Sequence, residues 1–230
     1  MNYIIWNGKN SKSISGLLIS ELPPITKPKM RTKTTTIDGR DGDIVDELGY
    51  ESYSKKIKIG LYGKFNIDEI IKYFTGSGKI VFSNEEDKYY IASITKDIDY
   101  ERLLRYRTAT IEFHVQPFKY KYDEAPFIFN IRDEEIVKVS NVGLEDSKPI
   151  LTIYGSGTVD LYINNSYVCQ LDIQDEYITL DSFEEEAYKG TTLMNRYMNG
   201  KFPKLEPGIN TIKLDGNVSK LIIEPKSRWL

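Results

Sequence analysis

The stretch IDGRDGDIVDELGYES, residues 37–52, places three glycines and six acidic residues around one arginine, Arg40. Its aspartates raise calcium binding as one interpretation, but the EF-hand pattern fails at Arg40. Glycine supplies the backbone freedom that tight turns need, and aspartate favours local hydrogen bonds in turns. We therefore interpret the stretch as the turn of a hairpin, with calcium as the minor alternative.

Strand-like sequence flanks this turn on both sides. MRTKTTTIDG, residues 30–39, enters it, and YESYSKKIKIGLY, residues 50–62, leaves it. In the second segment Ile57, Ile59 and Leu61 alternate with Lys56, Lys58 and Gly60. A period of two is typical of a strand with one buried face. The two segments together predict a hairpin longer than one small domain can bury.

The rest of the chain predicts a mainly β protein with one α-helix, over residues 66–76. Asn66 is a good N-cap, Glu69 completes a capping pattern, and Gly76 is a natural stop. A Pro-containing, weakly patterned stretch follows Pro117, and it predicts a boundary between domains of residues 1–122 and 123–230. Beyond it, short strands separated by Gly155-Ser156-Gly157, Asn164-Asn165 and Asp215-Gly216 predict a β-sandwich.

Composition excludes several classes of protein. The 230 residues are 40% hydrophobic and carry a net charge of -3. Neither half of the chain shows the basic excess that is expected of a dedicated nucleic-acid binder. The single cysteine, Cys169, forms neither an internal disulfide nor a cysteine-based zinc site. No apolar run approaches the ~20 residues of a membrane span, and the N-terminus lacks signal-peptide features.

No motif predicts catalysis. The only histidine, His114, lies mid-strand with no nucleophile in a known motif beside it, so a structural role is expected. Cys169 alternates with Tyr167 and Leu171, which is typical of a small buried residue. The TGSGK segment, residues 75–79, lacks the first glycine of a phosphate loop and precedes a strand. We expect no enzyme activity, no cofactor and no metal.

Two long stretches resemble the distal tail proteins of phages that infect Gram-positive bacteria. The first is TIDGRDG…LGYESY.KKIKI, residues 36–59. The second begins at PILTIYGSGTVDLYIN and includes the LDS before an acidic loop, GKFPKLEPGINTI and the final PKSRW. Together they cover nearly the whole chain in matching order.

The resemblance implies a structural hub of the tail tip or baseplate. Its N-terminal domain is expected to be a tail-tube-like β-sandwich that forms a hexameric ring, and its C-terminal domain a galectin-like β-sandwich. The implied partners are further copies of the chain, a tail-tube or tail-completion protein, and a tail fibre or tail-associated lysin. The protein is expected in the virion, after assembly in the host cytoplasm, where DNA passes the ring without being tightly bound.

In a ring, the exposed hairpin finds its partner on the next copy. The predicted inter-subunit residues are Asp38, Gly39, Arg40, Asp41, Gly42, Gly49 and Tyr50. At the other end of the chain, Pro225 is expected to end the last ladder. The Arg-Trp ending that recurs in the family predicts that Arg228 and Trp229 anchor the terminus on the sandwich.

Three alternatives stay open. A carbohydrate-binding module could act through exposed Tyr154, Tyr162 and Tyr167 of the C-terminal sandwich. The parent particle could be a contractile phage or a phage-tail-like bacteriocin. An enzyme such as a wall hydrolase ranks last, because no separated pair of carboxylates lies in a cleft-like pattern.

Overall fold

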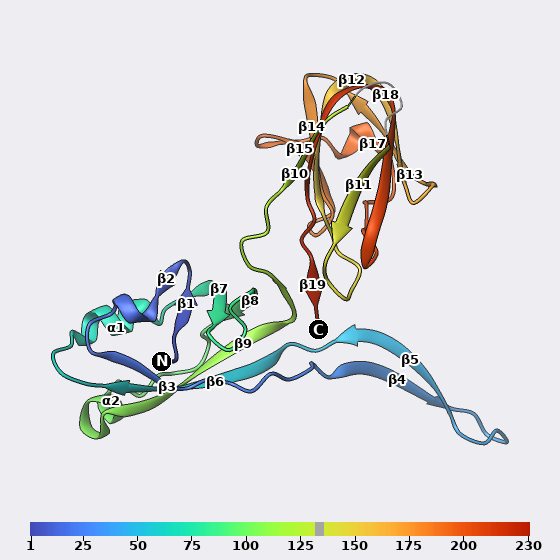
Figure 1. The fold of residues 1–230 in the computed structure, drawn as a ribbon. Helices are drawn as coiled ribbons and strands as arrows, with labels where there is room; N and C mark the ends of the chain where they lie inside the picture. Colours follow the sequence, from blue (N-terminus) through green and yellow to red (C-terminus); the bar gives the residue numbers. More distant parts are fainter. Residues whose placement is uncertain (132–135) are drawn as a thin grey trace. The chain divides into compact units, whose positions relative to one another are not determined.

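The computed structural model describes residues 1–131 and 136–230, and it divides into two compact units, Met1–Tyr122 and Asp123–Trp229 (Figure 1). Each unit has its own hydrophobic core. The fold is mainly β, as the alternation of apolar and polar residues predicts. Within the described ranges, no helix is long and apolar enough to cross a membrane.

The first unit is built on one antiparallel sheet with the strand order β2-β1-β7-β8-β9-β6-β3. Alternate residues of β6, among them Ile57 and Ile59, are fully buried, and they pair with β9 across the centre of the sheet. The strands of this sheet are β1 (Ile4–Trp6), β2 (Lys9–Asn10), β3 (Leu17–Glu21), β6 (Tyr53–Leu61), β7 (Ser77–Phe82), β8 (Lys88–Ser93) and β9 (Thr108–Lys121).

Helix α1 (Ile67–Tyr73) lies where the sequence predicts it. The side chain of Asn66 accepts hydrogen bonds from the backbone amides of Asp68 and Glu69, so it satisfies two amides that a helix start leaves free. Ile70 is fully buried. Gly76 follows the helix with φ +86°, a conformation that favours glycine.

The expectation of a single helix is wrong, because α2 (Tyr100–Tyr106) is a second one. Asp99 caps it by accepting a hydrogen bond from the amide of Arg102 at 2.8 Å. Of its residues only Leu103 is buried, while Leu104 and Tyr106 are exposed. A helix this short with one buried residue has no apolar stripe to reveal it. A short 3₁₀ turn, η1 (Ser11–Ser13), completes the unit.

A two-stranded ribbon, here called the arm, extends from the first unit and consists of β4 (Met30–Thr36) and β5 (Asp43–Tyr50) (Figure 1). The predicted hairpin is therefore present, but its return strand is β5 and not the expected segment 50–62. That segment becomes β6 of the central sheet. The alternation of Ile57, Ile59 and Leu61 already indicates burial, which the arm does not offer.

The second unit is a sandwich whose two layers share two long strands, β12 (Ile150–Ile163) and β18 (Gly208–Glu224). Residues 150–154 of β12 pair with β14, and residues 157–163 pair with β13. The other strands are β10 (Phe127–Asn130), β11 (Ile136–Asn141), β13 (Ser166–Ile173), β14 (Tyr177–Asp181), β15 (Glu186–Lys189), β16 (Thr192–Leu193) and β17 (Met198–Gly200), with a 3₁₀ turn η2 (Asn195–Tyr197). The short strand β19 (Arg228–Trp229), near the end of the chain, lies outside this sheet.

Two of the expected turns are bends inside these long strands. Gly155-Ser156-Gly157 lies within β12, and Asp215-Gly216 lies within β18. A Cβ at Gly155 would come within 2.2 Å of the Asn217 carbonyl oxygen, so the two paired strands lie too close together for a side chain there. Asn164-Asn165 is a true turn, with φ of 51° and 63°. β18 ends directly before Pro225, as predicted.

Candidate functional site: the exposed arm

The arm has no core of its own. None of the residues in β4 or β5 is buried. Ile37, Val45 and Leu48 are 45%, 55% and 53% exposed, although they are large apolar residues. An isolated two-stranded hairpin is at best marginally stable in water. The arm is therefore the part of the first unit that most needs a covering surface.

Backbone pairing and sequence still specify the arm locally. Thr34 pairs with Val45 and Thr35 with Ile44, so β-branched residues face one another across the ladder. The Thr36 hydroxyl donates to a carboxylate oxygen of Asp43 at 2.8 Å beside the turn. A register shift between Met30 and Thr32 interrupts the ladder near the base. These contacts fix the pairing without providing a buried face.

Glycine is required at the tip by conformation and not by crowding. Gly39 and Gly42 have φ of +82° and +77°, and a Cβ at either position would meet nothing within 4 Å. The Arg40 amide closes the turn on the Ile37 carbonyl at 3.2 Å. The expected turn bonds of Asp38 and Asp41 are absent, since neither carboxylate has a hydrogen-bond partner among the residues described.

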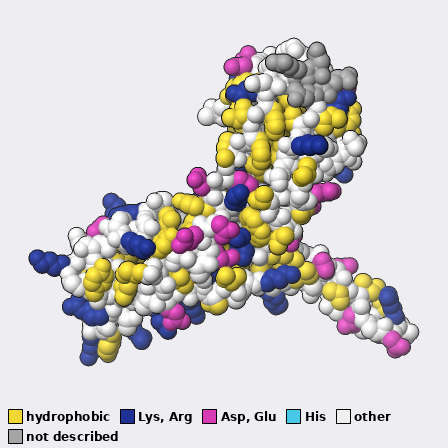
Figure 2. All heavy atoms as spheres, viewed as in Figure 1, with side chains coloured by type: hydrophobic (Ala, Val, Ile, Leu, Met, Phe, Trp, Pro, Cys, Tyr) yellow, Lys and Arg dark blue, Asp and Glu magenta, His cyan; other side chains and the backbone are white. Residues whose placement is uncertain are grey.

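The two strands of the arm carry opposite charge. Arg31 and Lys33 lie on β4, whereas Asp43, Asp46 and Glu47 lie on β5. Both signs and apolar atoms are visible on the surface of the arm, at the lower right of Figure 2. An edge of each sign can pair with a surface of the opposite sign on another molecule. In the described parts of the chain, no group of three or more His, Cys, Asp or Glu side chains is placed to hold a metal ion.

The base of the arm is anchored in the first unit. The Tyr50 ring packs edge-on against Phe118 with centroids 5.9 Å apart, and Lys27 lies over the same ring. The Glu51 amide donates to the Lys29 carbonyl at 2.8 Å. Gly49, with φ +91°, lies in β5 beside these contacts and not in the turn. The seven predicted hairpin residues thus divide between a tip, residues 38–42, and a base, residues 49–50.

The remaining predicted residues lie elsewhere. The Arg228 Nε donates to the Asp146 carbonyl at 2.5 Å, and the Arg228 carbonyl accepts from the amides of Leu144 and Glu145. Packing of Trp229 on the sandwich stays a prediction. Cys169 is fully buried, which raises the pKa of its thiol to about 12 and leaves it unreactive. His114 is exposed on β9.

The three tyrosines considered for sugar binding do not form one platform. Tyr154 packs against Tyr177, with centroids 5.1 Å apart, whereas Tyr162 packs against Tyr167 at 5.7 Å. Their neighbours Ile153 and Leu161 point into the same core from different layers, so Tyr154 and Tyr162 face opposite outer surfaces.

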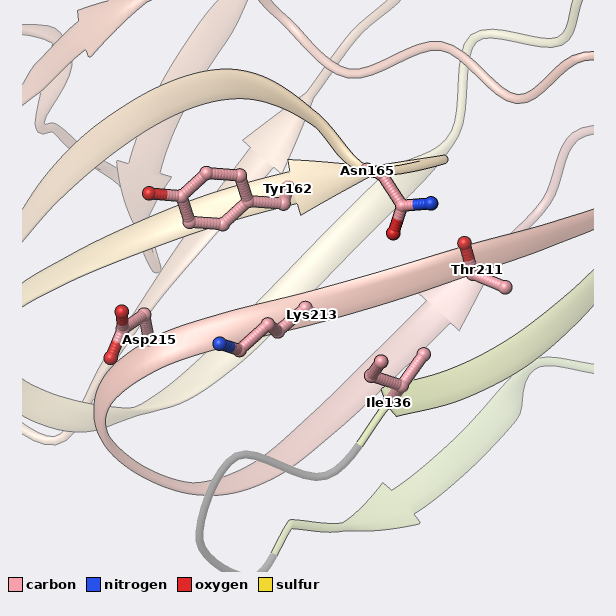
Figure 3. Close-up of a pocket in the computed structure, with 6 residues that line it drawn as sticks. All are labelled: Ile136, Tyr162, Asn165, Thr211, Lys213 and Asp215. Atoms are coloured by element: carbon pink, nitrogen blue, oxygen red, sulfur yellow. The ribbon is translucent and has the colours of Figure 1, made fainter.

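One of these surfaces has a small hollow of about 230 Å³ beside Tyr162 (Figure 3). Asn165, Thr211, Lys213 and Asp215 also line it. Tyr162 and Lys213 stand opposite each other on β12 and β18. Of the described residues that line it, only Tyr162 is aromatic, so these residues offer one ring for stacking.

Comparisons with known proteins agree with the architecture. Residues 12–115 match the model of the phage tail protein RIFT-related domain family. The solved structure of the Dit protein of phage SPP1, described as a paradigm of the hub adsorption apparatus in phages that infect Gram-positive bacteria, has a TM-score of 0.72 at 15% identity over 100% of both chains. The fold is that of a phage distal tail protein.

A second solved structure, the baseplate of phage P2 in its activated conformation with Ca, has a TM-score of 0.55 at 12% identity over 97% of both chains. The search of curated proteins gives no match. The resemblance to distal tail proteins stated from the sequence is thus confirmed by fold comparison over the whole chain and by a family model over most of the first unit.

Proposed function

We propose that the protein is a structural, non-enzymatic hub of a phage tail tip or baseplate. The observation that carries this proposal is the match of residues 12–115 to a phage tail domain, within a chain whose whole fold is that of the SPP1 Dit protein. Supporting it, the single cysteine, Cys169, is buried and the pKa of its thiol is raised to about 12, so it offers no reactive thiolate. The hydrolase alternative receives no support from the described residues.

The hub is a ring of six copies in which each arm lies on the next copy. The number six rests on the resemblance, and the arm supplies the physical reason for assembly. A ring needs a heterologous interface, in which two different surfaces of the same chain meet. The exposed ladder of β4 and β5, with its apolar residues Val45 and Leu48, is one such surface.

The ring joins the tail tube or a tail-completion protein to the distal tail fibre or tail-associated lysin, and it is a component of the virion. DNA passes through it during infection. The net charge of -3 supports passage without retention, because each phosphate contact through Lys or Arg would add salt-dependent affinity.

Light scattering and negative-stain images of the purified chain test this proposal. The expected result is a closed ring of six, formed by the protein alone or on addition of a neighbouring tail protein. A strictly monomeric protein at high concentration in both conditions would contradict it.

Duplex DNA binding provides a separate test. In fluorescence anisotropy at physiological salt, any dissociation constant for duplex DNA is expected to be micromolar or weaker. Sub-micromolar affinity would contradict free passage and would point to a DNA-binding lumen.

A further inference from the structure

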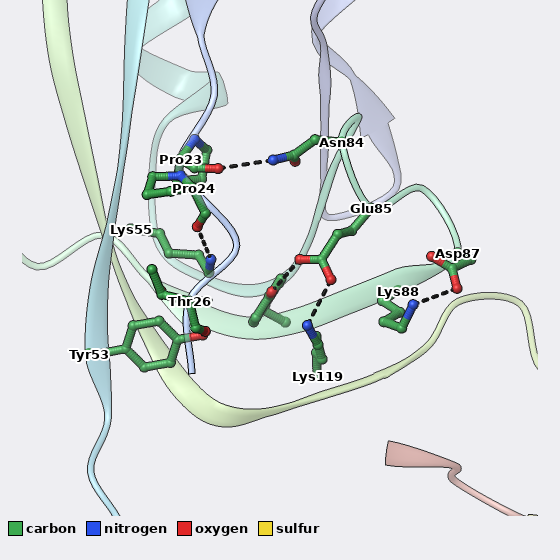
Figure 4. A network of polar contacts seen from close by, with 11 residues as sticks. Pro23, Pro24, Thr26, Tyr53, Lys55, Asn84, Glu85, Asp87, Lys88 and Lys119 are labelled. Carbon is green, nitrogen blue, oxygen red and sulfur yellow. Dashed lines mark hydrogen bonds and ion pairs between the residues drawn. The ribbon is translucent and has the colours of Figure 1, made fainter. Parts of the chain in front are cut away.

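A buried polar network lies beside the segment that leads into the arm (Figure 4). Lys55 of β6 and Lys119 of β9 are only 3% and 7% exposed. Glu85, in the turn between β7 and β8, pairs with Lys119 at 2.7 Å and accepts the Tyr90 hydroxyl at 2.6 Å. The cluster thus buries two ammonium groups and one carboxylate.

The Glu85 carboxylate already pairs with Lys119 and accepts the Tyr90 hydroxyl, so the Lys55 ammonium has other partners. Its Nζ donates to the Pro24 carbonyl at 2.9 Å. It also lies 4.9 Å from the ring centroid of Tyr90, 5.5 Å from that of Tyr53 and 5.9 Å from that of Phe82. These are the distances of cation–π contacts, which partly replace the hydration that burial removes.

The segment that Lys55 holds has no regular structure. Between the end of β3 at Glu21 and the start of β4 at Met30, Pro23 and Pro24 have no amide to donate to a ladder. Side chains satisfy their carbonyls instead: Asn84 donates to Pro23 at 2.9 Å, and Lys55 donates to Pro24. One donor from buried Lys55 and one from Asn84, in the turn after β7, therefore fix two successive carbonyls before the arm.

Stability alone does not account for a lysine at this position. A buried ammonium without a carboxylate partner costs folding free energy, and a methionine of similar length would fill the same space without that cost. Desolvation by burial accordingly lowers the pKa of Lys55 to about 8, partly offset by Glu85. The compensating gain is a directed hydrogen bond to one backbone carbonyl.

We propose that Lys55 and Asn84 act as a latch on the carbonyls of Pro23 and Pro24, fixing the position from which the arm leaves the first unit. They are positioning residues for the arm. The effect of the latch on ring assembly rests on the proposed function, whereas its effect on the segment itself does not.

Hydrogen exchange of the full chain tests the latch directly. The readout is the exchange rate of the Glu51 amide, which reports on the segment because it donates to the Lys29 carbonyl at 2.8 Å, compared with that of Ile111 in the core. In Lys55→Met and in Asn84→Ala, exchange in the segment is expected to rise about tenfold or more, because one hydrogen bond is lost in each. Exchange at Ile111 should change little in either variant.

The matched control is Lys56→Met, which removes an exposed lysine from the neighbouring position of the same strand. This substitution should leave the exchange rate in the segment at its wild-type value. Equal exchange rates in wild type, Lys55→Met and Asn84→Ala would overturn the proposal. So would a rise at Ile111 as large as that in the segment, since the residues would then support the whole unit. If Lys55→Met does not fold, Asn84→Ala decides by the same criteria.

Ring assembly of the two variants is measured separately by light scattering. Faster exchange in the segment with fewer rings supports both the latch and the role of the arm. Faster exchange with unchanged rings still supports the latch and contradicts the arm as the inter-subunit element, so the two claims fail independently.

Discussion

The arm and the β12–β18 pair are both long antiparallel ladders, but they meet water differently. Along β12 and β18, residues such as Leu161 and Leu214 are buried in alternation. Along β4 and β5, no residue is buried. The first ladder closes a core within one chain. The second has the pairing of a strand ribbon and lacks the apolar layer that makes such a ribbon stable alone.

The largest expected contrast is in stability. Leu161→Ala should lower the unfolding free energy of the second unit by about 2–5 kcal/mol, because it empties a fully buried position. Val45→Ala should change stability of the monomer by no more than about 0.5 kcal/mol, because Val45 is 55% exposed. Urea denaturation of both variants measures this. Similar losses in the two would mean that the arm is covered within its own chain.

The buried lysine beside the arm predicts a dependence on pH. Its pKa lies near 8 in the folded protein and is expected near 10.5 unfolded, so between these values the unfolded chain binds more protons. Stability should therefore rise from pH 8 to pH 10.5, relative to Lys55→Met, by at most about 3 kcal/mol. Lys119, Glu85, Tyr53 and Tyr90, which lie around Lys55, are present in both proteins. Parallel stability curves would show that Lys55 has an ordinary pKa.

Substitutions at the tip of the arm are expected to affect ring assembly more than they affect folding of the domain. Gly39→Val together with Gly42→Val forces positive φ on β-branched residues, at about 1–3 kcal/mol each. This strain acts on the arm, whose unfolding leaves the core intact. The thermal midpoint should stay close to that of wild type while the ring fraction falls. A collapsed midpoint with unchanged assembly per folded molecule would place the tip within the domain's own fold.

The C-terminal tether predicts a modest loss of stability in the second unit. Removing residues 228–230 deletes the Arg228 carbonyl that accepts from Leu144 and Glu145, and the guanidinium bond to Asp146. A loss of about 1–3 kcal/mol from the second unit is expected, with ring assembly retained. Thermal melts with and without the three residues measure it. Superimposable melts would leave Trp229 as a candidate contact for another tail protein.

Local sequence chemistry predicts some elements of this fold well. The Asn66 cap, the stop at Gly76 and the turn at Asn164-Asn165 each depend on residues adjacent in sequence, and each lies where predicted. Gly39 and Gly42 were likewise predictable as positions of positive φ. In these cases a single residue type decides the backbone conformation.

Elements that depend on distant contacts were not predictable in the same way. The return strand β5 carries Asp43, Asp46 and Glu47, which disfavour a strand unless pairing imposes it. The positions Gly155 and Gly216 are typical of turns in the sequence, yet they permit the close approach of two paired, continuous strands. The period of two places Lys55 on the buried face of Ile57 and Ile59, but a lysine is by its chemistry expected to be exposed, so the sequence gives no reason to assign it a partner inside the unit.

The central claim is that the arm holds one copy to the next, and native mass spectrometry of an arm-shortened chain tests it most directly. Met30 and Tyr50 are paired at the base, so an Asn-Gly turn can replace residues 31–49 and leave the central sheet intact. In the condition that supports rings of wild type, alone or with a neighbouring tail protein, wild type is predicted to show a species of six chains and the shortened chain only a folded monomer. The same distribution of masses for both proteins would contradict the account.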